Sequence, residues 1–160
     1  MIEVQELLHN LSLRGVRYLL CGGLAVNIYG VQRSTGDIDL LVDFDEENIA
    51  SFLSAVKTLH YINSLPLRLD ELVDEQTRMK HISERNLIAY SFYSTLKGRM
   101  SLDVLVDVPL PFEELWLRRE TRDFEGTNVE LVSREDLIRL KQYAGREQDK
   151  QDIILLSKSI

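Results

Sequence analysis

The spacing of apolar residues predicts helices along much of the chain. An amphipathic helix is expected over residues 2–13, where apolar side chains recur every three or four positions before Gly15 ends the pattern. Asp45 is placed to cap a second long helix that runs to about His60. Further helices are predicted at residues 24–29, 112–119, 136–144 and 148–158.

Short apolar stretches between these helices predict the strands of a sheet. The expected strands are residues 16–21, 38–43, 87–93, 101–108, 121–126 and 128–132. Polar residues near Lys97-Gly98 and around Gly126 favour turns that join the last four into two hairpins. Segment 66–80 is ambiguous, because it could be a helix but its apolar pattern is thin. This order predicts an α/β (α+β) fold, with a mixed central sheet flanked by helices and a helical C-terminus.

Length, composition and charge narrow the class of protein. The 160 residues predict a single domain, with a core at about 16–132 and C-terminal helices at about 133–158. The 26 acidic and 19 basic residues give a formal charge of -7, which argues against an extensive nucleic-acid surface. The chain has a single cysteine, its first residues do not resemble a secretory leader, and no apolar run is near the roughly 20 residues of a membrane span. We therefore expect a cytoplasmic protein without a membrane partner.

Two aspartates in one predicted strand carry the clearest chemical signal. Asp37 and Asp39 are two residues apart, so their side chains point to the same face with Cβ atoms roughly 7 Å apart. Asp103 interrupts the apolar strand 101–108 and would join them if the two strands are neighbours. Clustered carboxylates repel one another unless a cation lies between them, and Mg²⁺ (or Mn²⁺) prefers hard oxygen ligands. The three aspartates therefore predict a metal site, with two ions if all three converge.

A glycine turn supplies groups that bind anions, whereas the three aspartates bind cations. The strand that ends at Gly22 and Gly23 opens directly into a helix, which presents backbone N–H groups and a positive helix end to an anion such as phosphate. Arg33, Ser34 and Thr35 add a guanidinium and two hydroxyls that could hold the outer phosphates. The stretch therefore predicts a phosphate site beside the metal site.

Each of these pieces has a simpler explanation when taken alone. A lone pair of aspartates is more often a solvated strand edge, and a Gly-Gly pair often does no more than permit a tight turn. An EF-hand loop starting at Asp37 is a poor match, because Val42 stands where that loop needs glycine. The combination favours a site for a nucleoside triphosphate and a divalent metal.

The combination resembles the nucleotidyltransferases of the DNA polymerase β-like superfamily. That pattern has a Gly-Gly or Gly-Ser turn, an aspartate pair in a strand and a third carboxylate in a later strand. The local sequence GGLAVNIYGVQRSTGDIDLLV is similar to the minimal and abortive-infection-type toxin branches. In the toxin branch a lysine on a late helix and an aspartate in a following DxxD-like segment also belong to the site. The sequence LIRLKQYAGREQDKQDI matches this with Lys141 and Asp152, and with Asp149 as a further candidate.

The resemblance implies a nucleotidyltransferase-like fold and a metal-dependent enzyme. Such an enzyme moves a nucleoside monophosphate from a nucleoside triphosphate (NTP) to an acceptor hydroxyl on a protein, an RNA or a small molecule. The catalytic and metal-binding residues would be Asp37, Asp39 and Asp103, and Asp103 would also help to deprotonate the acceptor. Gly23 stands where many relatives have serine, which removes one hydroxyl contact to phosphate.

Two other interpretations stay open at this point. The chain could be a nucleotide-binding module with little turnover, acting as a toxin–antitoxin or regulatory partner. It could also be a phosphohydrolase-like metal enzyme that uses the same three acids. The sequence identifies neither the acceptor nor any protein partner or homo-oligomer.

Overall fold

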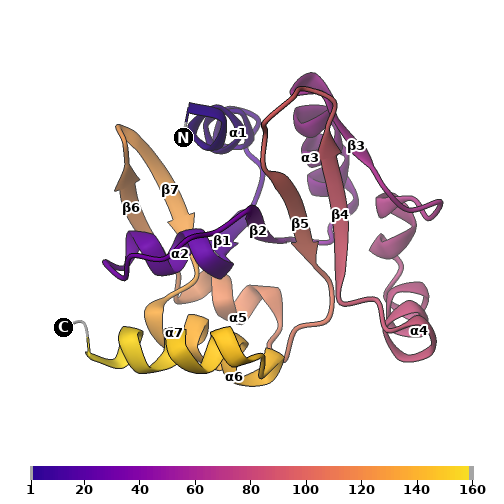
Figure 1. Ribbon diagram of the computed structural model, residues 1–160. Helices are drawn as coiled ribbons and strands as arrows, with labels where there is room; N and C mark the ends of the chain where they lie inside the picture. Colours follow the sequence, from indigo (N-terminus) through magenta and orange to yellow (C-terminus); the bar gives the residue numbers. More distant parts are fainter. Residues whose placement is uncertain (1, 159–160) are drawn as a thin grey trace.

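The computed structural model describes residues 2–158 as a mixed sheet covered by helices (Figure 1). The helices are α1 (Ile2–Leu13), α2 (Gly22–Ile28), α3 (Glu46–Thr58), α4 (Glu75–Arg85), α5 (Phe112–Leu117), α6 (Arg134–Ala144) and α7 (Glu147–Lys158), with a 3₁₀ helix, η1, at Leu69–Val73. The strands are β1 (Tyr18–Cys21), β2 (Asp37–Val42), β3 (Tyr61–Asn63), β4 (Ala89–Ser94), β5 (Ser101–Leu105), β6 (Glu120–Phe124) and β7 (Thr127–Leu131). None of the described helices is long and apolar enough to cross a bilayer.

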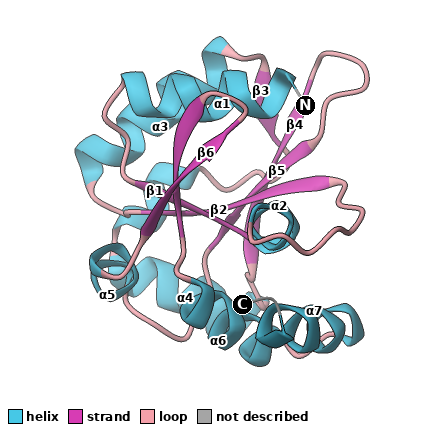
Figure 2. Cartoon of the chain, turned by 90° about the vertical axis from the view of Figure 1, so that its left-hand side faces the viewer, coloured by secondary structure: helices cyan, strands magenta, loops and turns pink. Residues whose placement is uncertain are grey.

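The strands form one sheet in the order β3-β4-β5-β2-β1-β7-β6. Strand β2 lies at its centre, antiparallel to β1 and parallel to β5. The two predicted hairpins are present as antiparallel pairs, β4 with β5 and β6 with β7. In both views α1 and α3 lie on one side of the sheet, and α5, α6 and α7 on the other (Figures 1 and 2). The C-terminal helices thus lie over the face opposite α1 and α3.

Alternation along β2 and β5 decides which side chains enter the core. Ile38 and Leu40 of β2 are fully buried, as are Leu102 and Val104 of β5. These residues pair across the two strands, Ile38 with Leu102 and Leu40 with Val104. Because side chains alternate in a strand, the aspartates between them point to the opposite face. The core thus fixes the direction of the site carboxylates.

The helices begin and end where local chemistry predicts. The apolar positions of α1 that were expected on one face are fully buried. Asp45 caps α3, since its side chain accepts hydrogen bonds from the Glu47 and Asn48 amides at 3.0 and 3.2 Å. Ser133 caps α6 in the same way, and Gly145 ends that helix in the left-handed region. Helix α6 is therefore capped at both ends.

The structure also contains elements that the apolar pattern did not define. The ambiguous segment is η1 followed by α4, and α4 has no buried residue, which explains its thin pattern. Strand β3 has only three residues, two of them exposed, and was not expected. The second hairpin turns at Glu125 and Gly126, slightly earlier than predicted. The two glycines of the predicted turn form the first turn of α2.

Candidate active site

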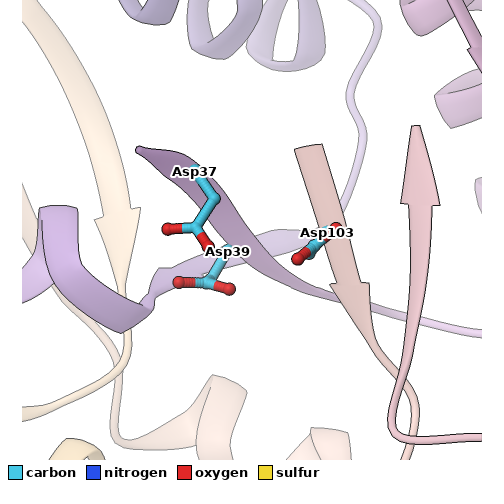
Figure 3. A group of neighbouring side chains, drawn as sticks. All are labelled: Asp37, Asp39 and Asp103. Carbon is cyan, nitrogen blue, oxygen red and sulfur yellow. The ribbon is translucent and has the colours of Figure 1, made fainter. Parts of the chain in front are cut away.

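Three carboxylates from two neighbouring strands converge on one face of the sheet (Figure 3). Asp37 and Asp39 lie on β2, and Asp103 lies on β5 directly opposite Asp39 in the strand register. One oxygen from each of the three lies within 4.8 Å of the others. The condition set by the sequence, that the two strands be neighbours, is therefore met. We call these residues the acidic triad.

The electrostatics of the acidic triad favour a bound cation. Burial, together with the negative charges of Asp37 and Asp103, raises the pKa of Asp39 to about 6. A carboxylate with this pKa is destabilised in its ionised form unless positive charge is nearby. The donor set consists of carboxylate oxygens, which fits Mg²⁺ or Mn²⁺. The residues present therefore suit a divalent metal.

Gly22 allows the start of α2 to approach the triad closely. Its φ of +61° lies in the left-handed region, and a Cβ there would lie 1.7 Å from Oδ2 of Asp39. A Cβ on Gly23 would lie 2.5 Å from Oγ1 of Thr35. The Thr35 side chain thus fills the space that a serine at position 23 would need. Both glycines are required by contact, and Gly22 also by backbone conformation.

The loop between α2 and β2 is held against the triad by two side chains. Asn27 makes two hydrogen bonds with the Arg33 backbone: its Nδ2 donates to the carbonyl and its Oδ1 accepts from the amide, each at 3.0 Å. The Thr35 hydroxyl donates to Oδ1 of Asp37 at 3.2 Å. Ser34 is exposed. Sequence reasoning did not identify Asn27, whose role depends on a contact six residues away.

A buried ion-pair cluster joins the C-terminal helices to this loop. Lys141 on α6 donates to Oδ2 of Asp152 at 2.7 Å and to Oδ1 of Asp149 at 3.3 Å, both on α7. Arg33 donates to the same Asp152 oxygen at 2.6 Å. Burial alone would raise the pKa of Asp152, but hydrogen bonds from Lys141 and Gln148 and the Lys141 charge hold it below its usual value. Asp152 is therefore an ionised anchor for two cations.

Arg146 is a site residue that the sequence did not reveal. It follows the Gly145 cap and pairs with Asp149 at 2.8 Å between Nε and Oδ2. Its positive charge also lowers the pKa of Asp39, against the effect of burial. The available signal was its position three residues before Asp149, which favours an ion pair on the first turn of a helix.

Two cavities meet at the acidic triad. The first, which we call the triad cavity, measures about 460 Å³ and is lined by all three carboxylates, by Ile88 and Leu105, and by Leu140 and Tyr143 of α6. The second, which we call the cation pocket, measures about 140 Å³ and is lined by Arg33, Lys141 and Arg146 together with Asp37 and Asp39. Gly22 lines the first and Gly23 the second.

Three of the predicted nucleotide-binding residues lie outside the linings of both cavities. Ser34, Thr35 and Asp152 line neither the triad cavity nor the cation pocket. Thr35 and Asp152 contact residues that do line them, namely Asp37 and the cations Arg33 and Lys141. Their direct contact with nucleotide stays a prediction.

Comparisons with known proteins agree with this geometry. The chain resembles the structure of lincomycin-bound LnuA, a lincosamide antibiotic adenylyltransferase, with a TM-score of 0.67, 15% identity, and coverage of 99% of this chain and 97% of that chain. It resembles the antibiotic-resistance factor ANT(2'')-Ia with a TM-score of 0.63, 15% identity, and coverage of 99% and 82%. An antigenic nucleotidyltransferase-like protein from Paracoccidioides brasiliensis gives a TM-score of 0.54, 19% identity, and coverage of 96% and 72%. The predicted nucleotidyltransferase-like fold is confirmed.

The family comparison is more specific than the fold. No curated protein matches the chain. Residues 7–151 match the model of a family described as nucleotidyl transferase AbiEii toxin, type IV toxin–antitoxin system. This span contains the acidic triad, the glycine turn and Lys141. The chain therefore belongs to the AbiEii family of nucleotidyltransferase toxins.

Proposed function

We propose that the chain transfers a nucleoside monophosphate from an NTP to an acceptor hydroxyl in a reaction that depends on a divalent metal. Asp37, Asp39 and Asp103 would hold Mg²⁺ or Mn²⁺. Bound metal would polarise the phosphoryl oxygens and stabilise the charge that develops during transfer. The observation that carries the proposal is that three carboxylates converge within 4.8 Å beside a pocket lined by three cations.

The cation pocket is the proposed site of the outer phosphates. Arg33, Lys141 and Arg146 provide charge-assisted donors there, and guanidinium groups suit phosphate oxygens. Lys141 is 4% exposed and is held by two buried carboxylates, so its direction is set before a ligand arrives. We assign Asp149 and Asp152 the role of positioning these cations. Fixed donors of this kind need little reorganisation when the triphosphate binds.

The chemistry follows from the position of the triad. The acceptor oxygen forms a bond to the α-phosphorus, the bond from that phosphorus to the bridging oxygen breaks, and pyrophosphate leaves. Asp103 is the proposed base, and its carboxylate takes the proton of the acceptor hydroxyl. Asp37 and Asp39 would hold metal beside the α-phosphate throughout. Because the chain belongs to the AbiEii family, its proposed biological role is that of a toxin that a partner antitoxin counteracts.

Transfer of label from NTP tests the proposal. Each of the four NTPs, labelled at the α-phosphate, is incubated with Mg²⁺ and with protein, RNA or small-molecule fractions of a cell extract. We expect label to enter one fraction with the wild type and not with Asp103→Asn. Asp123→Asn, an exposed change on β6, is the matched control and should behave as the wild type. NTP binding without transfer to any fraction would favour the regulatory module instead.

A further inference from the structure

The two cavities that meet at the acidic triad differ in size and lining. The triad cavity, at about 460 Å³, is within the range of roughly 300–1,000 Å³ typical of small-molecule sites, and apolar side chains such as Ile88, Leu105 and Leu140 line it. The cation pocket is smaller, at about 140 Å³, and its described lining consists of charged residues, Gly23 and Gln148. Of these two cavities, only the triad cavity offers both the room and the apolar contacts that an aromatic ring needs.

The two cavities share part of their lining. Asp37, Asp39, Lys141 and Arg146 belong to both. The proposed function places the outer phosphates in the cation pocket and the α-phosphate at the acidic triad. The nucleoside is joined to the α-phosphate, so it must leave the triad on a side that has room for it. The triad cavity provides that room.

Tyr143 presents an unused aromatic ring to the triad cavity. It lies three residues after Leu140 on α6, so the two side chains share a face of the helix, and both line the cavity. The side chain of Tyr143 is 54% exposed. Within residues 2–158, no aromatic ring and no cation stacks on it. One face of the ring is therefore available to a ligand.

A hydrogen bond limits the orientations of this ring. The Tyr143 hydroxyl donates to Oδ1 of Asp107 at 2.9 Å, and the Asp107 amide donates to the Ile88 carbonyl at 3.2 Å. These bonds join α6 to the chain that follows β5 and to the residue before β4. Ile88 is 64% exposed and lines the same cavity. A ring held in this way has less freedom to lose when a flat ligand stacks on it.

We propose that the Tyr143 ring stacks on the nucleobase of the bound NTP, and that Asp107 is a positioning residue for that ring. This inference rests on the proposed transferase function and adds how the base is held. Stacking suits a nucleobase, because every base has a π-face, and loss of one such contact costs roughly 5- to 150-fold in affinity. The acceptor hydroxyl, in contrast, is placed at Asp103 on β5.

Comparison of probes with and without a nucleoside tests the assignment. The probes are the α,β-methylene analogues of ATP, GTP, CTP and UTP, which cannot release pyrophosphate, and inorganic tripolyphosphate, which has the phosphates alone. Their affinities are measured by calorimetry in the presence of Mg²⁺. We expect at least one nucleotide analogue to bind the wild type at least about fivefold more tightly than tripolyphosphate. The ratio of the two affinities isolates the nucleoside from the metal and phosphate contacts.

Three variants assign this ratio to the ring. Tyr143→Ala should lower it by at least about fivefold and leave tripolyphosphate binding unchanged. Tyr143→Phe keeps the ring and loses only the bond to Asp107, so the ratio should stay within about threefold of the wild type. Tyr93→Ala is the matched control, because Tyr93 is 53% exposed and lines neither cavity. A triphosphate of the fluorescent base 2-aminopurine should be quenched by the wild type and by Tyr143→Phe, but not by Tyr143→Ala.

The outcomes separate this inference from the transferase proposal. An unchanged ratio in Tyr143→Ala, or an equal loss of tripolyphosphate binding, would overturn the assignment of the base to Tyr143. Loss of transfer in Tyr143→Ala with unchanged NTP affinity would also overturn it, because the ring would then contact the acceptor. If no probe shows binding that depends on Mg²⁺, the proposed function fails and this inference fails with it.

Discussion

Replacement of Asp39 by asparagine is expected to stabilise the metal-free protein. Burial and the charges of Asp37 and Asp103 raise the pKa of Asp39 from 3.8 to about 6. A shift of about two pKa units corresponds to about 3 kcal/mol of folding free energy, at about 1.4 kcal/mol per unit. Asparagine has the same shape and no charge, so Asp39→Asn should recover up to about 3 kcal/mol.

The effect has a definite pH dependence. Between pH 3.8 and about 6 the folded protein keeps a proton on Asp39 that the unfolded chain releases, so folding stability falls as the pH rises through this window. Above about pH 6 the destabilisation is complete and constant. The stability advantage of Asp39→Asn should therefore be largest at pH 7–8 and disappear near pH 4.

Urea unfolding in EDTA measures this advantage directly. The free energy of unfolding is determined for the wild type, Asp39→Asn and the control Asp123→Asn at several pH values between 4 and 8. Addition of Mg²⁺ should then stabilise the wild type and leave Asp39→Asn unchanged. If Asp39→Asn is no more stable than the wild type at pH 8 in EDTA, the claim that ionised Asp39 destabilises the metal-free protein is refuted.

Two further changes test the parts that surround the triad. Gly22→Ala should lose metal binding and should destabilise the protein by more than Gly30→Ala. Both glycines have a positive φ, which costs about 1–2 kcal/mol in alanine, but only at Gly22 would the added Cβ also collide with Asp39, because a Cβ at Gly30 meets no atom within 4 Å. Calorimetric Mn²⁺ titration and urea unfolding compare the two variants. Lys141→Met should destabilise by about 2–3 kcal/mol, because it removes the buried cation that Asp149 and Asp152 share and leaves each of them with one arginine. Lys150→Met breaks an exposed pair and should change stability by less than about 0.5 kcal/mol. Equal losses within either pair would contradict this reasoning.

The local parts of the fold could be predicted because each depends on nearby residues. Only a few consecutive residues determine the caps at Asp45 and Ser133 and the alternation in β2. The pairing of β2 with β5 could only be stated as a condition, because it joins segments about sixty residues apart. No local pattern encodes such a long-range choice of neighbour.

The missed parts of the site have physical reasons of the same kind. Arg146 and Asn27 make local contacts, with Asp149 three residues away and with the Arg33 backbone six residues away, but only the fold places these contacts beside the acidic triad. Outside the site, a cavity of about 620 Å³ lies where α4 approaches the end of β5, and it was not predicted because α4 has almost no apolar pattern. The resemblance located the late lysine and aspartate, and the structure adds that Asp152 contacts Lys141 and Arg33.

The central claim is that Asp37, Asp39 and Asp103 hold metal for an NTP. Electron paramagnetic resonance of Mn²⁺, titrated with the wild type and an NTP analogue that cannot release pyrophosphate, tests it most directly. The account predicts that the analogue binds only with Mn²⁺, and that Asp39→Asn and Asp103→Asn abolish this binding while Asp123→Asn preserves it. Analogue binding that is independent of Mn²⁺, or unchanged in Asp103→Asn, would contradict it.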